Sequence, residues 1–272
     1  MGRIRNTVQK NKIYWELPLL FLFVCITARA ELVKKKQLLL HFDKVVVNGA
    51  IDVFIQPGQR NEESTIYSDS EIINKVSLYV RNRTLFVDAN NSFNLMRRIP
   101  FVRFNADRTF PVEVIICIDE LSEILVNNRA NVTVSEIKSK KLAITCSGTG
   151  RFHLENIDCE EISMKHFGNG PVILKGKGVN NLDLLVTGNG PFFAQELLVQ
   201  RAKVVHRGAN NIQIQPSRFL DSRIFGKGSV VLHNRPDHLV VNQQGNGSVL
   251  DIIPDAPPFY DLNKTKPILG SP

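Results

Sequence analysis

Three side chains with reactive chemistry stand at the same position of a recurring pattern. Cys146, His166 and His206 each lie two residues before a glycine, and they are separated by 20 and 40 residues. If that spacing is a structural period, Cys146 and His166 face the interior on adjacent repeats, ~5 Å apart. A thiol and an imidazole at this distance could act as a nucleophile pair or hold part of a metal site. We favour instead an interior of satisfied polar side chains, because Zn²⁺ requires three or four converging ligands.

Glycine runs invite nucleotide-binding and Ca²⁺-binding interpretations, and their spacing excludes both. Gly148-Thr149-Gly150 lacks the third glycine of a dinucleotide fingerprint, and no helical pattern follows it. Gly176-Lys177-Gly178 lacks the upstream glycine and the Ser or Thr of a phosphate loop. A Ca²⁺-binding roll repeats every nine residues with an aspartate after its glycines, unlike the pattern here. The sequence therefore predicts no cofactor and no metal site.

Carboxylates decide between a binding protein and an enzyme. Enzymes that cleave acidic polysaccharides also use β-helices, and they gather carboxylates on one outer face to hold Ca²⁺ or to serve as acid and base. Asp183 would have Ser163 and Lys203 as its neighbours on adjacent repeats, which makes no cluster. We interpret the other local group of acids as a solvated turn around Cys159; its members are Glu155, Asp158, Glu160 and Glu161. We predict no catalytic residues, with a polysaccharide lyase or hydrolase as the alternative.

The glycines mark a repeat that predicts the fold. Six segments follow one another at intervals of 20, 20, 20, 18 and 19 residues: CSGTGRFHL, HFGNGPVIL, VTGNGPFFA, HRGANNIQI, IFGKGSVVL and QQGNGSVLD. A fixed period of this length is typical of a solenoid. Apolar residues alternate with polar ones on both sides of the glycines, which indicates strands rather than helices. A twenty-residue contour of roughly 66 Å is enough for one turn of a narrow three-sided coil.

The predicted fold is therefore all-β: a right-handed, single-stranded parallel β-helix with about 20 residues per coil, preceded by an amino-terminal β block. At each corner we expect glycine to supply φ > 0, and Asn169 and Asn189 to share amide hydrogen bonds between coils. The segment from Ile124 to Val134 reads as an earlier coil if Arg129 is matched to Gly148, and Val45 to Ile55 has the same pattern. The irregular stretch 90–107 is predicted to be a long loop.

The two ends of the chain differ from the repeats in composition. Residues 1–30 have a basic start, an apolar stretch too short to span a bilayer, and the small-x-small sequence Ala28-Arg29-Ala30. We predict a signal peptide cleaved before Glu31, with an uncleaved anchor or a lipoprotein at Cys25 as alternatives. The remainder divides into the amino-terminal β block (31–120), continuous with the solenoid, the repeats (121–252) and a Pro-rich tail (253–272). The expected location is the periplasm, the outer membrane or the cell exterior.

Charge and cysteine content limit the function classes further. The chain carries a net charge of +8, but residues 1–30 hold five basic residues and one acid, so the predicted mature chain carries +4. No basic run is interleaved with aromatic residues, and we therefore expect no nucleic-acid binding. Cysteines 117, 146 and 159 remain after cleavage. An odd number means that at least one thiol is free or pairs with another chain.

Three blocks in a particular order resemble a known family. FDKVVVNGAIDVFIQPG is followed by VEVIICIDELSEILVNNRANVTV and then by the serial SGTG and GNG repeats. This order is similar to the bacterial head GIN domain family, labelled a putative auto-transporter adhesin, over roughly His41 to Ile252. The resemblance implies an exported β-helical protein of the bacterial envelope that acts in adhesion. It brings no characterised catalytic residues. The sequence departs from the family's preferred Gly-Ser-Gly at Gly208-Ala209-Asn210.

The predicted outer surface is more apolar than a solvated solenoid requires. The outward positions just before the corners hold an apolar group, Phe167, Leu185, Val205 and Phe225, edged by the basic residues Lys165, Arg207 and Arg223. A second outward column holds Ile173, Phe193 and Val231. Apolar surface with a basic rim is typical of an interface. We expect one face to pack against the amino-terminal block and the other to bind a surface ligand, an anionic glycan or protein, or a second copy in a homo-oligomer. The alternative is that both faces are covered within the chain.

Overall fold

The protein was analysed as a computed structural model that describes residues 32–59, 63–99 and 102–252. The predicted signal peptide and Pro-rich tail lie outside the described residues. The described part is built of strands: β1 (Leu32–Leu38), β2 (Lys44–Gly49), β3 (Asp52–Pro57), β4 (Glu63–Asp69), β5 (Val76–Arg81), β6 (Thr84–Ala89), β7 (Ser92–Ile99), β8 (Val102–Thr109), β9 (Val112–Ile118), β10 (Glu123–Val126), β11 (Asn131–Ser135), β12 (Lys138–Cys146), β13 (Phe152–His166), β14 (Val172–Val186), β15 (Phe192–His206), β16 (Ile212–Ile224), β17 (Val230–Leu232), β18 (His238–Gln243) and β19 (Val249–Asp251).

Helical structure in this part is limited to a single 3₁₀ turn, η2 (Ile73–Lys75). Within the described ranges, no helix has both the length and the apolar character needed to cross a membrane.

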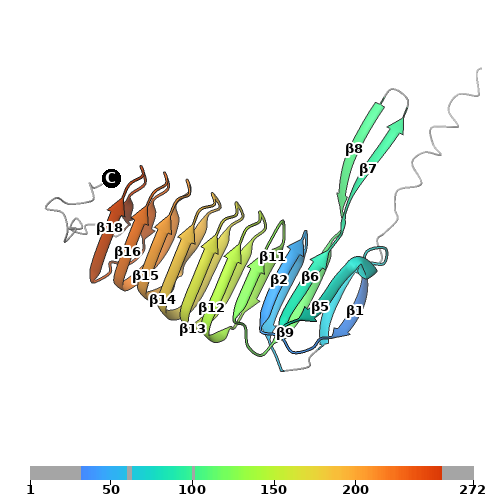
Figure 1. Cartoon of the computed structure of the whole chain (residues 1–272), viewed down its shortest axis with the longest axis horizontal. Helices are drawn as coiled ribbons and strands as arrows, with labels where there is room; N and C mark the ends of the chain where they lie inside the picture. The colour runs from blue at the N-terminus through green and yellow to red at the C-terminus, as the bar shows by residue number, and fades with distance from the viewer. Residues whose placement is uncertain (1–31, 60–62, 100–101, 253–272) are drawn as a thin grey trace, which may run out of the picture. The chain divides into compact units, whose positions relative to one another are not determined.

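Successive coils stack in parallel with equivalent residues in register (Figure 1). Ile144 pairs with Met164, Met164 with Leu184, and Leu184 with Val204. These partners are 20 residues apart in the sequence, so one coil takes about that length. The prediction of an all-β solenoid with this period is confirmed.

Each coil has two long sides joined by the glycine corner. The strands that precede the corner in each coil form one sheet, the pre-corner sheet, and the strands that follow it form another, the post-corner sheet. The pre-corner sheet consists of β6, β2, β10, β12, the second halves of β13 to β16, and β18. The post-corner sheet consists of β9, β3, β11, the first halves of β13 to β16, β17 and β19. Side chains alternate along each strand, so one set fills the interior and the other faces outward. Phe152 and Phe192 are among the largest fully buried side chains of this core.

The corner glycines serve a different purpose from the one predicted. Of the described glycines, only Gly49 has φ in the left-handed region, at +102°. The glycines of the repeats are needed because consecutive corners lie directly on one another. A Cβ on Gly170 would overlap the carbonyl oxygen of Gly150 and lie 2.7 Å from the carbonyl carbon of Thr149. Backbone hydrogen bonds at the corners hold this close approach, as in Asn169 N–H to Gly148 O at 3.0 Å.

Asparagine side chains support the corners, but not by exchanging amide hydrogen bonds with each other as predicted. The Asn169 side-chain oxygen accepts a hydrogen bond from the backbone N–H of Asn189 at 3.3 Å. The Asn189 oxygen does the same for Ala209 at 3.0 Å. Each asparagine therefore ties its own corner to the backbone of the next coil.

The amino-terminal block contributes coils that are not stacked in sequence order. β2 lies between β6 and β10, and β3 lies between β9 and β11, all in parallel. The segments predicted as early coils do form coils. The predicted match of Arg129 to Gly148 is wrong by one residue, because Val126 pairs with Cys146 and Asn128 therefore lies beneath Gly148.

Antiparallel strands close this end of the stack. β5 pairs with β6, β4 pairs with β9, and β1 pairs with β4. Residues 90–107, predicted to form a loop, instead contain most of a separate two-stranded sheet made by β7 and β8. The sequence prediction failed there because no glycine corner marks this segment, although Val102, Phe104 and Ala106 alternate with polar residues as in a strand.

Candidate interaction surface

The seven predicted surface residues lie on one outer area of four adjacent coils. Register places Lys165, Leu185, Val205 and Arg223 in one outward column of the pre-corner sheet. Two residues further along each coil, a second column at the start of the corner consists of Phe167, Thr187, Arg207 and Phe225. We call these eight positions the surface lattice. Sequence reasoning found every member except Thr187, whose polar side chain carried no signal.

The two phenylalanines at the ends of the second column are the most accessible apolar side chains of the lattice. Phe167 is 45% exposed and Phe225 is 40% exposed. The guanidinium of Arg207 lies 5.2 Å from the centre of the Phe225 ring, which is a cation–π contact. Leu185 and Val205 are half-buried beside them. The apolar area is therefore divided by a cation rather than continuous.

The first lattice column continues into the amino-terminal coils, which sequence reasoning did not foresee. From Lys165 the column passes to Thr145 and then to Leu125. Leu125 pairs with Val46, and Val46 pairs on its other side with Phe86. Tyr79 completes the column and stacks on Phe86 with the ring centres 5.0 Å apart. The sequence did not indicate this continuation, because the coils that carry these residues are not stacked in sequence order.

The second predicted strip lies on the post-corner sheet and is also longer than expected. Ile173, Phe193 and Val231 share a column in which Gln213 interrupts the apolar residues. It extends to Leu250, 37% exposed, at one end, and at the other end it passes through His153 and Thr133 to Phe54, 39% exposed. The amino-terminal coils continue the stack along its axis. The expectation that this block covers one of the two strips is therefore wrong.

A polar groove follows the corners at the amino-terminal end of the surface lattice. It has a volume of about 780 Å³, and Phe167 is one of its lining residues. Within it, the amide of Asn127 donates to the side-chain oxygen of Asn48 at 2.9 Å. The hydroxyl of Ser147 donates to the side-chain oxygen of Asn127 at 2.5 Å. These groups form a ladder of amide and hydroxyl groups along the stacking direction.

A second groove crosses the pre-corner sheet and gathers more carboxylates than the sequence predicted. Its volume is about 800 Å³. Its acidic lining residues are Glu123, Glu161, Asp183 and Asp221. Ion pairs with basic neighbours engage Glu123 with Lys44 at 3.2 Å and Glu161 with Lys141 at 2.8 Å. As predicted, Asp183 lies between Ser163 and Lys203. The groove is thus lined by alternating charges.

The predicted column of Cys146, His166 and His206 exists, and it is closed to solvent. Cys146 is 6% exposed, His166 is 1% exposed and His206 is not exposed. Each histidine points its Nε2 at a corner carbonyl, of Gly190 at 3.3 Å and of Asn210 at 2.8 Å. Because a carbonyl only accepts, Nε2 carries the proton in both rings. Burial raises the pKa of Cys146 to about 12, which keeps the thiol protonated and unreactive.

The described part of the chain offers no grouping of three His, Cys, Asp or Glu side chains that could hold a metal ion. Cys146 and Cys159 are buried free thiols. The histidine column is thus a polar element of the core, with each ring fixed by one corner.

We expect the folded protein to lose stability as the pH falls below 6.5. Burial lowers the pKa of both His166 and His206, so between 6.5 and the folded pKa the unfolded chain binds protons that the folded chain does not. The free energy of unfolding then decreases with falling pH by up to about 1.4 kcal/mol per pH unit for each histidine. Urea unfolding at pH 7.5, 6.5 and 5.5 measures the slope.

The matched variant is His166→Val with His206→Val, because Val186 already occupies the same column between them. Its unfolding free energy should depend less on pH over this range. An unchanged slope in the variant would assign the acid sensitivity to other groups.

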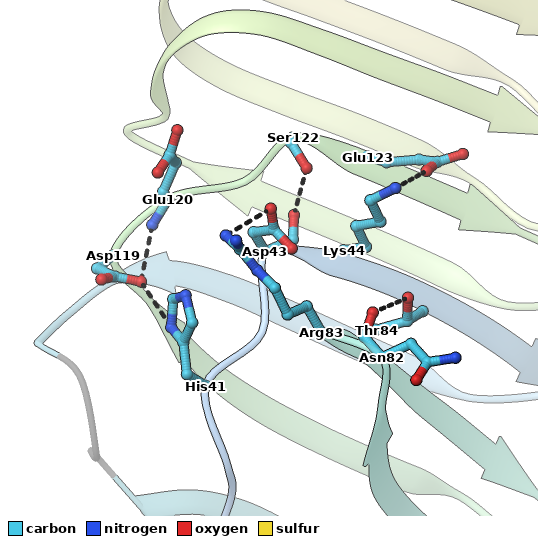
Figure 2. Close-up of polar contacts among 10 residues, drawn as sticks. All are labelled: His41, Asp43, Lys44, Asn82, Arg83, Thr84, Asp119, Glu120, Ser122 and Glu123. Atoms are coloured by element: carbon cyan, nitrogen blue, oxygen red, sulfur yellow. Dashed lines mark hydrogen bonds and ion pairs between the residues drawn. The ribbon is translucent and has the colours of Figure 1, made fainter.

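A further polar cluster lies where the first three coils meet, and Figure 2 shows its contacts. Arg83 pairs with Asp43 at 3.0 Å, and the hydroxyl of Ser122 donates to the Asp43 carbonyl at 3.0 Å. His41 lies 3.9 Å from Asp119. These bonds join segments from residues 41–44, 82–84 and 119–123, which stack out of sequence order. We assign the cluster to holding these coils together.

Comparison with known proteins places the chain among β-solenoids. Residues 41–236 match the protein family described as "Putative auto-transporter adhesin, head GIN domain". A putative adhesin of Bacteroides fragilis has a similar structure, with a TM-score of 0.67 and 18% identity, covering 82% of this chain and 97% of that chain. A putative lipid binding protein of Parabacteroides distasonis has a TM-score of 0.59 and 14% identity, covering 83% and 98%.

A putative adhesin of Parabacteroides merdae has a TM-score of 0.54 and 18% identity, with coverage of 83% and 98%. At these identities the structural likeness shows the fold alone. No curated protein sequence matches the chain.

Proposed function

Because the chain belongs to the head GIN domain family, described as putative auto-transporter adhesins, we propose that it is an exported envelope protein that binds a ligand on its outer surface. Binding requires accessible side chains rather than reactive ones, and the surface lattice provides them. The predicted signal peptide supports export to the periplasm, the outer membrane or the cell exterior.

The observation that carries this proposal is the pair of exposed rings at either end of one lattice column. Phe167 and Phe225 present large apolar areas beside the cations Lys165, Arg207 and Arg223. Exposed aromatic and arginine side chains supply much of the binding energy at protein interfaces. An anionic glycan or a protein surface with apolar and acidic groups would complement this arrangement. A second copy of the chain is the third ligand that fits it.

Replacing both phenylalanines is expected to weaken ligand binding at least about tenfold, or ~1.4 kcal/mol. The variant Phe167→Ala with Phe225→Ala removes both apolar platforms and leaves every charge in place. A chain that begins at residue 31 would be tested by surface plasmon resonance against purified glycans, purified extracellular proteins and itself.

The matched control is Phe54→Ala with Leu250→Ala, which removes residues of similar exposure, 39% and 37%, from the post-corner sheet. The control should bind within about twofold of the wild type, since singly exposed apolar residues outside an interface contribute little. Equal losses in both variants would show that the lattice has no special role. A wild-type chain that binds nothing in the panel would contradict the proposed function.

The acidic groove of the pre-corner sheet favours a second candidate, a carbohydrate-active enzyme. Four carboxylates line it, which meets the general need of such enzymes for an acid and a base. Three of them are engaged with cations, in ion pairs of 2.8 to 3.4 Å with Lys141, Lys44 and Arg223. We rank catalysis second for this reason. Following the chain length of each glycan during the binding experiments tests it directly.

A further inference from the structure

In the repeat region, acidic residues are absent from the glycine corners and occur only on the remaining surface, whereas basic residues occur on both. We define the corner edge as residues 127–131, 147–151, 167–171, 187–191, 207–211, 225–229 and 244–248, which stack on one another. This edge contains no Asp or Glu, whereas four of its residues are cations. They are Arg129, Arg151, Arg207 and Lys227, and all four are exposed.

The absence of acids on the corner edge is not a property of the whole surface. The acidic residues between positions 121 and 252 all lie on other parts of the coils. They include the lining of the acidic groove and Glu196, which pairs with Lys175 at 3.0 Å. Elsewhere in the repeats the cations are mixed with acids. At the amino-terminal end of the edge, the exposed carboxylate of Asp52 accepts a hydrogen bond from Asn131 at 2.7 Å, so the edge presents positive charge alone from residue 147 onward. Such an edge attracts polyanions by its summed potential.

Neutral groups on the corner edge add hydrogen bonds and apolar contact. The polar groove of about 780 Å³ spans the first three corners of this edge and the corners of the amino-terminal coils beside them. It contains the Asn48, Asn127 and Ser147 ladder, with Phe167 following in the same column. Amide and hydroxyl groups can pair with sugar hydroxyls, and exposed rings can cover the apolar face of a sugar. The same column then runs through Arg207 to Phe225.

The corner edge is also straight and firmly held. Corners of adjacent coils are joined by backbone hydrogen bonds, such as Gly190 N–H to Gly168 O at 3.2 Å, and by the asparagine bonds to Asn189 and Ala209. Equivalent positions therefore recur about every 4.8 Å along the stack. A linear polymer lying along this direction would meet the same kind of group repeatedly. A rigid site loses little conformational entropy on binding.

We propose that the corner edge binds a linear anionic polysaccharide, which lies along the stacking direction from Ser147 in the polar groove to Phe225. This rests on the proposed function, because it names the ligand class and the place of surface binding. A polysaccharide fits better than a single-stranded nucleic acid. Nucleic-acid channels stack successive bases on aromatic side chains, whereas the two exposed rings of this column are separated by Thr187 and Arg207.

The decisive experiment removes the corner charges and an equal number of charges from elsewhere. The corner variant changes Arg129, Arg151, Arg207 and Lys227 to Gln. The control variant changes four exposed cations at the opposite bend of the coils to Gln, namely Lys138, Lys140, Lys177 and Arg218. Both variants have the same net charge, and all eight positions are exposed, so thermal unfolding should match the wild type within a few degrees.

Affinity for alginate, dextran sulfate and neutral dextran would be measured by isothermal titration calorimetry at several salt concentrations. The wild type should bind both anionic polymers and not dextran. The corner variant should bind them at least about tenfold more weakly, with a shallower dependence on salt, because fewer counterions are released. The control variant should stay within about threefold of the wild type.

Equal weakening in the corner and control variants would overturn the corner edge as the site, and surface binding by the lattice would stand. Wild-type binding to dextran or to proteins alone would also overturn this inference without affecting the proposed function. Tighter binding of single-stranded oligothymidylate than of alginate, lost in the corner variant, would replace the polysaccharide with a nucleic acid. If the wild type binds no ligand of any class, the proposed function fails as well.

Discussion

Replacing Gly170 with alanine is expected to destabilise the folded protein by about 3 kcal/mol or more. The new Cβ would overlap the carbonyl oxygen of Gly150 and lie within 2.8 Å of that residue's carbonyl carbon. These are backbone atoms, so no side chain can rotate away. Overpacking costs of 1 to 3 kcal/mol are typical where side chains can adjust, and here two hydrogen-bonded coils would have to separate. Urea unfolding followed by circular dichroism gives the free energy of unfolding.

Gly178→Ala is the matched control for this prediction. Its Cβ would have one near neighbour, the carbonyl oxygen of Leu198 at 3.8 Å, which is an ordinary contact. Its unfolding free energy should therefore remain within about 1 kcal/mol of the wild type. Similar losses at both glycines would show that backbone freedom, rather than the contact between corners, explains why glycine is needed.

Phe192→Ala is expected to cost about 3 to 5 kcal/mol of stability. Phe192 is fully buried and lies in register between Val172 and Ile212 on the neighbouring coils. Truncating a buried aromatic ring removes its transfer free energy and leaves a cavity. The stacked backbone is held on both sides by hydrogen bonds, which limits its collapse into that space. The same urea titration measures the loss.

The adjacent residue provides the control for the core prediction. Phe193 points to the outside of the post-corner sheet and is half-buried. Phe193→Ala should cost only about 1 kcal/mol, since part of its surface is already in water. If the two variants were equally destabilised, the assignment of inner and outer columns on this strand would be wrong.

The residues that stack in the interior of the solenoid could be predicted from the sequence, because their positions depend only on the two-residue period of a strand and the twenty-residue period of the coils. Alternation along a strand decides which residues face inward, and the twenty-residue spacing decides which of them touch. Met164 and Leu184 pair as that spacing requires. The same rule assigns Phe167 and Phe225 to one outward column, and the register of the coils agrees with that assignment.

The failures concern contacts that no local pattern records. Glycine at a corner is compatible both with positive φ and with close approach, and the distance from Gly170 to Gly150 is visible only in three dimensions. The acidic groove combines Glu123 and Asp221 from coils far apart in the sequence. The continuation of the first lattice column to Val46 depends on a coil that the chain visits out of order.

The position of β2 and β3 between two later coils has a consequence for how the chain acquires its structure during synthesis. Val45 must wait for Leu85 on one side and Ile124 on the other before its strand has both partners. The glycine repeats need only a neighbour some twenty residues away, so their loop-closure cost is small. Folding should therefore start in the carboxy-terminal half, and β2 and β3, although synthesised before the repeats, should be among the last strands to gain both of their partners.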